Sequence, residues 1–307
     1  MFSLILLAAI KKSMACRYDG APNLRYFTPA DFGMKSEPFS FKSGKWLLRG
    51  ERVFPEGEPK ALLVFFHGLG AGHSAYTQEI CALAKQGYLV YAYDNTGCMT
   101  SEGDVAGFFP QSLLDQEAFF SYLDEQEKVR DLPRYAAGHS WGGFTALGAL
   151  DKRYHVQKVV CISGFLSVAS IVFDVQPKLA KFEKWFRKAM KIGYGKYGNI
   201  DMLDMIDASN ARVLYVAGEN DPMVRVRISH DALKKRFEKQ KRVETLLVPD
   251  ALHQPYWTLE AQAYYHKIKK EHHLFEPTFD NSFAVDYSKL NEDEPKVMAA
   301  VFDFLAR

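Results

Sequence analysis

The stretch Gly138-His139-Ser140-Trp141-Gly142-Gly143 decides the fold of this chain. A short apolar segment, residues 134–137, precedes it and predicts a strand, and residues 141–150 after it predict a helix. A strand that turns sharply into a helix holds the serine between them in a strained conformation, for which only glycine-sized neighbours leave room. The hydroxyl of Ser140 is then exposed above the sheet, close to the free N–H groups of a helix N-terminus. The stretch therefore predicts a nucleophilic serine.

Strands and helices alternate on both sides of this stretch. The alternation implies parallel strands joined by right-handed crossovers, and so an α/β fold with an open, mostly parallel sheet of about eight strands and helices on both faces. Ligands bind such sheets at the carboxyl ends of the strands. Residues 39–55 alternate in polarity around Ser43-Gly44 and predict two antiparallel strands. The other expected strands are 61–66, 88–93, 156–162, 211–217 and 243–248, and the other expected helices are 76–85, 111–128, 226–239 and 295–305.

Two long segments interrupt the alternation, residues 164–210 and residues 256–294. Long insertions in a compact domain are usually functional or disordered, and we expect both to act as lids over a site. The chain thus divides into an N-terminal extension, 1–38, and a domain, 39–307, that carries both insertions. The first insertion contains a helix-like stretch with large apolar residues spaced for one face: Phe182, Trp185, Phe186 and Met190.

Two further strand-end loops carry an acid and a base. The loop after residue 217 reads GENDP and presents Asp221, and the loop after residue 248 reads PDALH and presents His253. A serine hydroxyl is a weak nucleophile and needs a base that is held by a third group. The chain order serine, acid, histidine favours Ser140, Asp221 and His253 as that triad. Glu219 and Asp250 are rivals for the role of the acid.

The sequence His67-Gly68-Leu69-Gly70 follows an earlier expected strand. Acyl transfer places negative charge on a carbonyl oxygen, and two backbone N–H groups must be positioned to receive it. The natural pair is the N–H of Trp141, directly after the nucleophile, and the N–H of Leu69 in this glycine-bordered turn.

Together these motifs resemble the α/β-hydrolase family, and more narrowly its monoacylglycerol-lipase-like and serine-aminopeptidase-like branch. The resemblance covers residues 39–307. Residues 94–103 (DNTGCMTSEG) are similar to the branch's Asp-x-x-Gly-x-Gly-x-Ser loop, with Met99 in place of the second glycine. Residues 164–210 lie where the family carries its helical cap. The insertion after His253 is longer than the single closing helix that the family implies.

The resemblance implies a serine hydrolase that cleaves small or monoacyl carboxylic esters through an acyl-enzyme, with neither a metal nor an organic cofactor. One alternative keeps the triad and changes the bond, as an aminopeptidase or amidase. An aminopeptidase needs an acidic group to hold the substrate amine, and Glu219 or Asp174 are the residues available. The other alternative is a non-catalytic binding protein, which the loss of a triad member would mark.

Composition excludes some classes of partner. The 307-residue chain has a formal net charge of +2 and no dense basic stretch with interleaved aromatic residues, so a nucleic-acid partner is not expected. Basic residues recur at helical spacing within the first insertion, as one solvated face of an amphipathic helix does: Lys181, Lys184, Arg187, Lys188 and Lys191.

The N-terminal sequence leaves two readings open. Residues 1–10 (MFSLILLAAI) are apolar, but ten residues are too short to span the roughly 30 Å of a bilayer core. Positive charge follows this run at Lys11 and Lys12, whereas a signal peptide carries its positive charge before the apolar run. Residues 1–12 are therefore either a weak membrane-associating segment or sequence upstream of a true start at Met14. Four scattered cysteines without a C-x-x-C pair favour a cytoplasmic protein, with peripheral membrane association left open.

Overall fold

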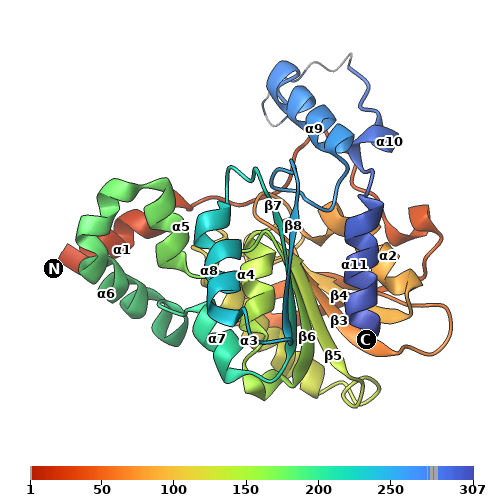
Figure 1. Cartoon of the computed structure of the whole chain (residues 1–307), viewed down its shortest axis with the longest axis horizontal. Helices are drawn as coiled ribbons and strands as arrows, with labels where there is room; N and C mark the ends of the chain where they lie inside the picture. The colour runs from red at the N-terminus through yellow and green to blue at the C-terminus, as the bar shows by residue number, and fades with distance from the viewer. Residues whose placement is uncertain (1, 275, 277–278, 280–282) are drawn as a thin grey trace.

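The computed structural model describes residues 2–274, 276, 279 and 283–307 (Figure 1). Eight strands in this part of the chain form one sheet in the order β1-β2-β4-β3-β5-β6-β7-β8. Strands β3 to β8 are mutually parallel, and β2 is antiparallel to both of its neighbours. The mostly parallel sheet predicted from the alternation is confirmed. The strands are β1 (Ser36–Ser43), β2 (Trp46–Val53), β3 (Ala61–Phe66), β4 (Tyr88–Tyr93), β5 (Arg134–His139), β6 (Val156–Ile162), β7 (Arg212–Gly218) and β8 (Val243–Val248).

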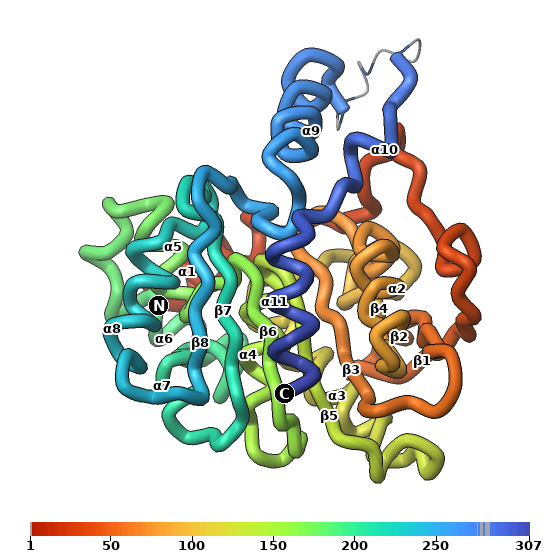
Figure 2. The backbone as a smooth tube through the Cα atoms, turned by 45° about the vertical axis from the view of Figure 1, so that its right-hand side comes forward, coloured from red at the N-terminus to blue at the C-terminus, as the bar shows by residue number. Residues whose placement is uncertain are grey.

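Helices cover both faces of this sheet (Figures 1 and 2). One face carries α3 (Gln111–Asp124), α4 (Trp141–Gly148) and α8 (His230–Phe237), and the other carries α2 (Thr77–Lys85) and α11 (Pro295–Ala306). Strand β3 shows why its sequence is apolar throughout. Its residues alternate between two hydrophobic cores, with Leu62, Val64 and Phe66 in one and Leu63 and Phe65 in the other. A strand that is buried on both faces has no polar side.

Two helices differ from their expected bounds by more than two residues, and α4, which ends at Gly148, is two residues shorter than expected. The helix expected over 111–128 ends at Asp124, where the N–H groups of Glu125 and Gln126 bond to carbonyls three residues back and so tighten the last turn. The helix expected over 226–239 is a 3₁₀ turn at 226–228 followed by α8, with Ser229 outside helical geometry between them.

The first insertion, residues 164–210, folds as a cap of short helices: α5 (Val168–Val175), α6 (Glu183–Tyr194) and α7 (Met202–Ala208). The expectation of one apolar face on α6 is wrong for Trp185. Phe186 and Met190 form the buried stripe with Ala189, whereas Trp185 is one residue away from Phe186, about 100° round the helix, and is 43% exposed.

The N-terminal extension begins with a helix, α1 (Phe2–Ser13), that packs along α6 of the cap. Phe2 contacts the rings of Phe182 and Trp185, and a side chain on Gly193 would collide with Leu7. The glycine therefore allows the two helices to approach closely. No helix in the described part of the chain is long and apolar enough to cross a membrane.

The second insertion, residues 256–294, forms a separate projection that contains α9 (Leu259–Glu271) and α10 (Tyr287–Leu290) (Figure 2). Its residues 275, 277–278 and 280–282 lie outside the described part. The N-terminal extension packs against this projection. The backbone N–H of Arg25 donates to the Tyr287 hydroxyl at 2.6 Å, and the Asn23 amide donates to the Leu274 carbonyl at 3.3 Å. Residues far apart in the sequence are thus brought together beside the sheet.

Candidate active site

Ser140 lies on the sharp turn between β5 and α4. Its φ of 57° and ψ of −117° lie outside the regions that side-chain-bearing residues normally adopt. The glycines on either side explain how the chain tolerates this turn. A Cβ on Gly142 would overlap the Phe66 carbonyl oxygen, and a Cβ on Gly138 would overlap the Gly142 carbonyl. The start of α4 can therefore sit directly against the end of β3, with Ser140 at the apex.

The three residues proposed for the triad lie within hydrogen-bonding distance of one another. The Ser140 Oγ is 2.8 Å from Nε2 of His253, and the Nδ1 of the same imidazole is 2.8 Å from Oδ2 of Asp221. Their loops follow β5, β8 and β7, whose carboxyl ends lie at the same edge of the parallel sheet. The parallel topology therefore places residues more than a hundred positions apart in direct contact.

Asp221 is fixed by more than its contact with His253. Its Oδ1 accepts hydrogen bonds from the backbone N–H groups of Met223 at 2.8 Å and Val224 at 3.0 Å. Burial alone would raise the pKa of Asp221, but the His253 imidazole and these two amides outweigh it and hold the pKa below its ordinary value. The carboxylate is thus ionised and oriented toward Nδ1 of His253.

The rival carboxylates point elsewhere. The Glu219 side chain accepts from the Asp250 backbone N–H at 3.2 Å, and both residues are exposed. Neither has a hydrogen bond to His253 in the described structure. The geometry therefore separates Asp221 from Glu219 and Asp250, which sequence alone left open.

The expected oxyanion turn lies beside the nucleophile. Phe66 at the end of β3 pairs with Gly138 at the end of β5, so the turn that contains Leu69 adjoins the elbow that contains Ser140. The backbone N–H of Trp141 belongs to the first turn of α4, where such groups have no intrahelical partner. Leu69 and Ser140 line the same chamber, and Leu69 is 40% exposed to it and to solvent.

A buried hydrogen-bonded chain that the sequence analysis missed joins the site's loops. The Gly68 N–H donates to the Tyr76 hydroxyl at 3.1 Å, and this hydroxyl donates to Nδ1 of His139 at 2.9 Å. The Nε2–H of His139 then donates to the His253 carbonyl at 2.8 Å. Burial, with the nearby His253, lowers the pKa of His139 to about 3, so this imidazole is neutral and has the single donor that the chain requires. The sequence shows His139 directly before Ser140, but nothing in it indicates that Tyr76 is the hydrogen-bond partner of His139.

Asp94 joins the segment after the oxyanion turn to the loop that follows β4. Its Oδ1 accepts from the backbone N–H of His73 at 2.8 Å and lies 2.7 Å from the ring Nδ1, and its Oδ2 accepts from Thr100. Burial alone would raise the pKa of Asp94, but His73 and Thr100 hold it well below its ordinary value. Met99, which replaces a glycine of the family loop, has a φ of 39° and so keeps a glycine-like backbone at that position.

A chamber of about 520 Å³ opens onto Ser140 and His253. This volume lies within the roughly 300–1,000 Å³ typical of small-molecule sites. Its wall comes from the oxyanion turn, from residues 18–32 of the N-terminal extension, and from the second insertion. Nine aromatic side chains contribute to it: Tyr18, Tyr26, Phe27, Phe32, Tyr76, Tyr256, Trp257, Tyr265 and Tyr287.

The cap has a different place from the one expected. No residue of 164–210 lines the described wall of the chamber, so the expectation that both insertions form it is wrong for this one. The cap packs instead on α1, on α4 and on the turn that precedes α8. Asp174, a candidate for binding a substrate amine, is held there by Arg225 and Arg227.

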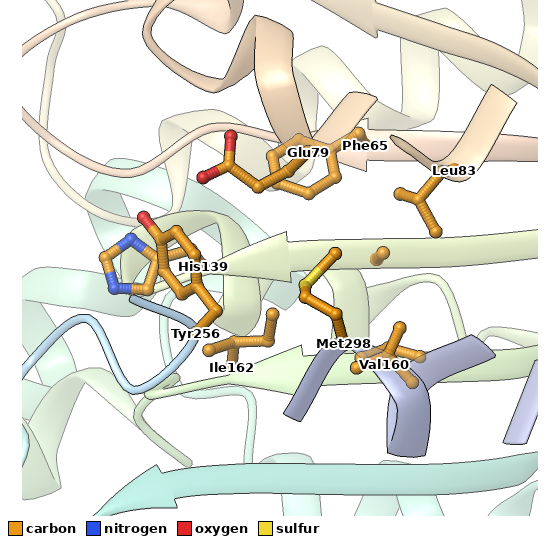
Figure 3. A pocket seen from close by; sticks show the side chains of 10 residues that line it. Phe65, Glu79, Leu83, His139, Val160, Ile162, Tyr256 and Met298 are labelled. Carbon is orange, nitrogen blue, oxygen red and sulfur yellow. The ribbon is translucent and has the colours of Figure 1, made fainter. Parts of the chain in front are cut away.

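A second cavity, of about 20 Å³, shares Glu79, His139 and Tyr256 with the chamber. Figure 3 shows the Tyr256 ring beside His139, with the Glu79 carboxyl above them. Burial, together with the nearby Asp293, raises the pKa of Glu79 to about 8, and burial raises the pKa of Asp293 to about 6. The Trp257 indole donates to Glu79 at 3.2 Å. The hydrogen bond between Trp257 and Glu79 therefore joins α2 to the second insertion.

No cluster of three or more His, Cys, Asp or Glu side chains in the described structure has the geometry to hold a metal ion.

A family model described as serine aminopeptidase, S33 (Hydrolase_4), matches residues 57–247. The chain belongs to this family. The matched region of this chain contains Ser140, Asp221 and the oxyanion turn, and it ends before His253.

Curated relatives and solved structures agree with this assignment. The chain is similar to human monoglyceride lipase, to which it is 34% identical over 113 residues that cover 36% of each chain. It is also similar to caffeoylshikimate esterase of Arabidopsis thaliana, with 28% identity over 130 residues that cover 41% of this chain and 39% of that enzyme. The matched regions thus span less than half of these relatives. An esterase from Pyrococcus furiosus, Pf2001, superposes with a TM-score of 0.62 at 18% identity, over 83% of this chain and 97% of its own. The α/β-hydrolase fold is confirmed.

Proposed function

We propose that this S33-family protein is a serine hydrolase that cleaves carboxylic esters, with Ser140 as nucleophile, His253 as general base and Asp221 as the acid that orients it. The observation that carries the proposal is the unbroken chain of two 2.8 Å contacts, from Ser140 Oγ through the imidazole to Asp221. A nucleophile, a base and an orienting group within hydrogen-bond reach of one another are the signature of covalent acyl transfer.

The reaction proceeds in two steps. As Ser140 Oγ attacks the acyl carbon, His253 Nε2 takes the hydroxyl proton, and the ionised Asp221 stabilises the imidazolium that forms. The N–H groups of Leu69 and Trp141 receive the carbonyl oxygen as it becomes negative. His253 then returns the proton to the leaving alcohol. Water, deprotonated by the same imidazole, releases the acid from Ser140 in the second step.

The chamber favours an ester over a peptide with a free amine. An ammonium group needs an ionised carboxylate nearby, and the two acids available from sequence do not line the chamber. Asp174, on the cap, pairs with Arg225 and Arg227 of the turn before α8, and Glu219 bonds to a backbone N–H. Glu79 does line it, but a pKa of about 8 keeps most of that carboxyl protonated at neutral pH. The nine aromatic side chains of the wall suit an apolar acyl or alcohol group.

A non-catalytic role on the same fold is disfavoured by the same geometry. Such a protein has no need to retain the strained backbone at Ser140, which costs of the order of 1–3 kcal/mol. Nor does it need a buried carboxylate aimed at a histidine, because burying a charge costs free energy that only its partners offset.

The test is hydrolysis of p-nitrophenyl esters from acetate to laurate, with Ser140→Ala alongside. Ser74→Ala is the matched control, because Ser74 also lines the chamber but lies outside the triad. We expect turnover by the parent and by Ser74→Ala, and its loss in Ser140→Ala with the fold intact. The acyl-chain length that gives the highest turnover then indicates how long an acyl group the chamber accommodates. Inactivity of the parent on every ester, with cleavage of aminoacyl amides, would replace the esterase by the amidase.

A further inference from the structure

Exposed apolar side chains gather on the cap and α1, outside the wall of the chamber. Eleven large apolar side chains are exposed in the described part of the chain, and seven of them lie on these segments. Because scattered exposure is normal and clustering is not, this patch needs an explanation. We call it the α1–α6 face, and its apolar residues are Phe2, Leu4, Ile5, Val175, Leu179, Trp185 and Ile192.

Helix α1 is apolar on two sides. Its buried side consists of Ser3, Leu7 and Ile10, which are spaced to pack against α6. Its other side presents Leu4, 57% exposed, and Ile5, 61% exposed. A surface helix of a globular protein normally places polar residues on the side that faces solvent. One side of α1 is thus covered by α6, whereas the side with Leu4 and Ile5 is exposed to solvent.

The same segments are strongly basic. Residues 176–192 contain six basic side chains and one acidic side chain, Glu183, which pairs with Arg187. Lys11 and Lys12 add two more cations at the end of α1. The formal net charge of the whole chain is only +2, so positive charge is concentrated on these short segments. The six residues, all exposed, are Lys178, Lys181, Lys184, Arg187, Lys188 and Lys191.

We infer that the α1–α6 face docks the protein on the surface of an anionic lipid membrane. Apolar side chains among lysines match an interface in which acyl chains lie beneath negative headgroups. Trp185, half-exposed beside Phe2, has the amphipathic ring that favours the headgroup level. A second copy of the chain fits less well, because a two-fold contact would place the same cations opposite each other.

The docking is peripheral. The 12 residues of α1 extend about 18 Å as a helix, short of the roughly 30 Å of a bilayer core. α1 is also held along α6 by its buried side, so it lies on the cap instead of projecting from it. The face therefore binds by shallow insertion of Leu4, Ile5 and Trp185 and by attraction of the lysines to lipid headgroups. The inference does not depend on the proposed esterase activity.

The experiment is flotation of the full chain with vesicles of phosphatidylcholine alone and with vesicles in which roughly a third of the lipid is phosphatidylglycerol. We expect binding to the anionic vesicles that weakens with added salt. The double variant Lys184→Glu/Lys188→Glu should reduce the partition coefficient at least tenfold, as should Leu4→Gln/Ile5→Gln. The matched control is Lys234→Glu/Lys239→Glu, which removes the same charge from exposed positions on and beside α8.

A second readout locates the contact. Trp185 emission should shift to shorter wavelength on binding, and the shift should disappear in Trp185→Phe. The far-UV circular dichroism spectrum and the urea unfolding midpoint check that each variant is folded. Absence of binding to either vesicle, or an equal loss in the control variant, overturns the inference. So does a parent that forms dimers which the Leu4→Gln/Ile5→Gln variant abolishes without any effect of vesicles.

Discussion

Asp221→Asn tests the proposed mechanism most sharply, because the structure dictates which way the new amide must face. The Met223 and Val224 N–H groups both donate to Oδ1 of Asp221. In the variant, the amide oxygen must occupy this position, since an NH₂ group there would face two donors. The Asn NH₂ is thereby directed at Nδ1 of His253, which must accept. The imidazole proton is then forced onto Nε2, the nitrogen that should take the proton of Ser140.

The expected loss of kcat is large because Nε2 of His253 becomes a hydrogen-bond donor and can no longer accept the proton of Ser140. The variant keeps shape and hydrogen bonds, yet presents Ser140 with a donor instead of an acceptor. A change of this kind in a serine triad lowers kcat by about 10⁴-fold, or roughly 5 kcal/mol of barrier. Stability should change little at neutral pH by comparison, because both backbone donors remain satisfied.

The assay is single-substrate kinetics with p-nitrophenyl butyrate, and the matched controls are Glu219→Gln and Asp250→Asn. Each control removes a carboxylate from a strand-end loop without touching His253. We expect kcat within a few-fold of the parent in both. An Asp221→Asn enzyme that keeps more than a tenth of the parental kcat would refute the assignment, and a large loss in Glu219→Gln would move the role to that residue.

Three further outcomes are expected. Gly142→Ala should prevent folding or sharply lower the urea midpoint of unfolding, because its Cβ would overlap the carbonyl of Phe66 in β3. The control Gly44→Ala lies in open space at φ 57° and should lower the free energy of unfolding by only about 1–2 kcal/mol. Tyr76→Phe should lower the free energy of unfolding by about 1–3 kcal/mol by leaving the buried Gly68 N–H unpaired, and an unchanged urea midpoint would contradict this. The pKa of Glu79 rises from 4.5 to about 8 on folding, so between these values the native state holds a proton that the unfolded chain has released. The free energy of unfolding should therefore fall as pH rises through this window, by up to about 1.4 kcal/mol per unit, and the fall should be smaller in Glu79→Gln; equal slopes would count against it.

The bounds of β3, β4, β6 and β8 agree with the prediction, whereas β1 begins three residues before its expected start and β5 ends two residues after its expected end. Strands β3 and β4 coincide with uninterrupted apolar runs, whereas β6 contains Gln157 and Lys158 and β8 contains Glu244 and Thr245. Strand β3, covered by helices on both faces, needs an uninterrupted apolar sequence, and polar or glycine residues mark where its cover ends. Helix ends were harder, because the last turn of α3 is closed by local backbone geometry that no single residue announces.

The proximity of the three residues proposed for the triad was predictable for a topological reason. Parallel strands all end at one edge of the sheet, so Ser140, Asp221 and His253 had to lie near one another once their strands were recognised. The chamber wall was not predictable in this way. Which insertion covers the site depends on the direction in which each leaves the sheet, and sequence periodicity carries no such information. Trp185 illustrates the same limit, since its spacing matched a buried stripe that it does not join.

The origin of the chamber wall has a consequence for the timing of synthesis. Residues 18–32 leave the ribosome before any strand of the sheet, whereas Trp257, Tyr265 and Tyr287, which adjoin them in the wall, are made more than two hundred residues later. During that interval the aromatic rings of the early segment lack their partners on the second insertion, such as Tyr287, whose ring lies 5.3 Å from that of Phe27. A nascent chain can thus complete most of its sheet while its chamber is still half built. Translation of the last segment, and not formation of the sheet, is the event that closes the chamber.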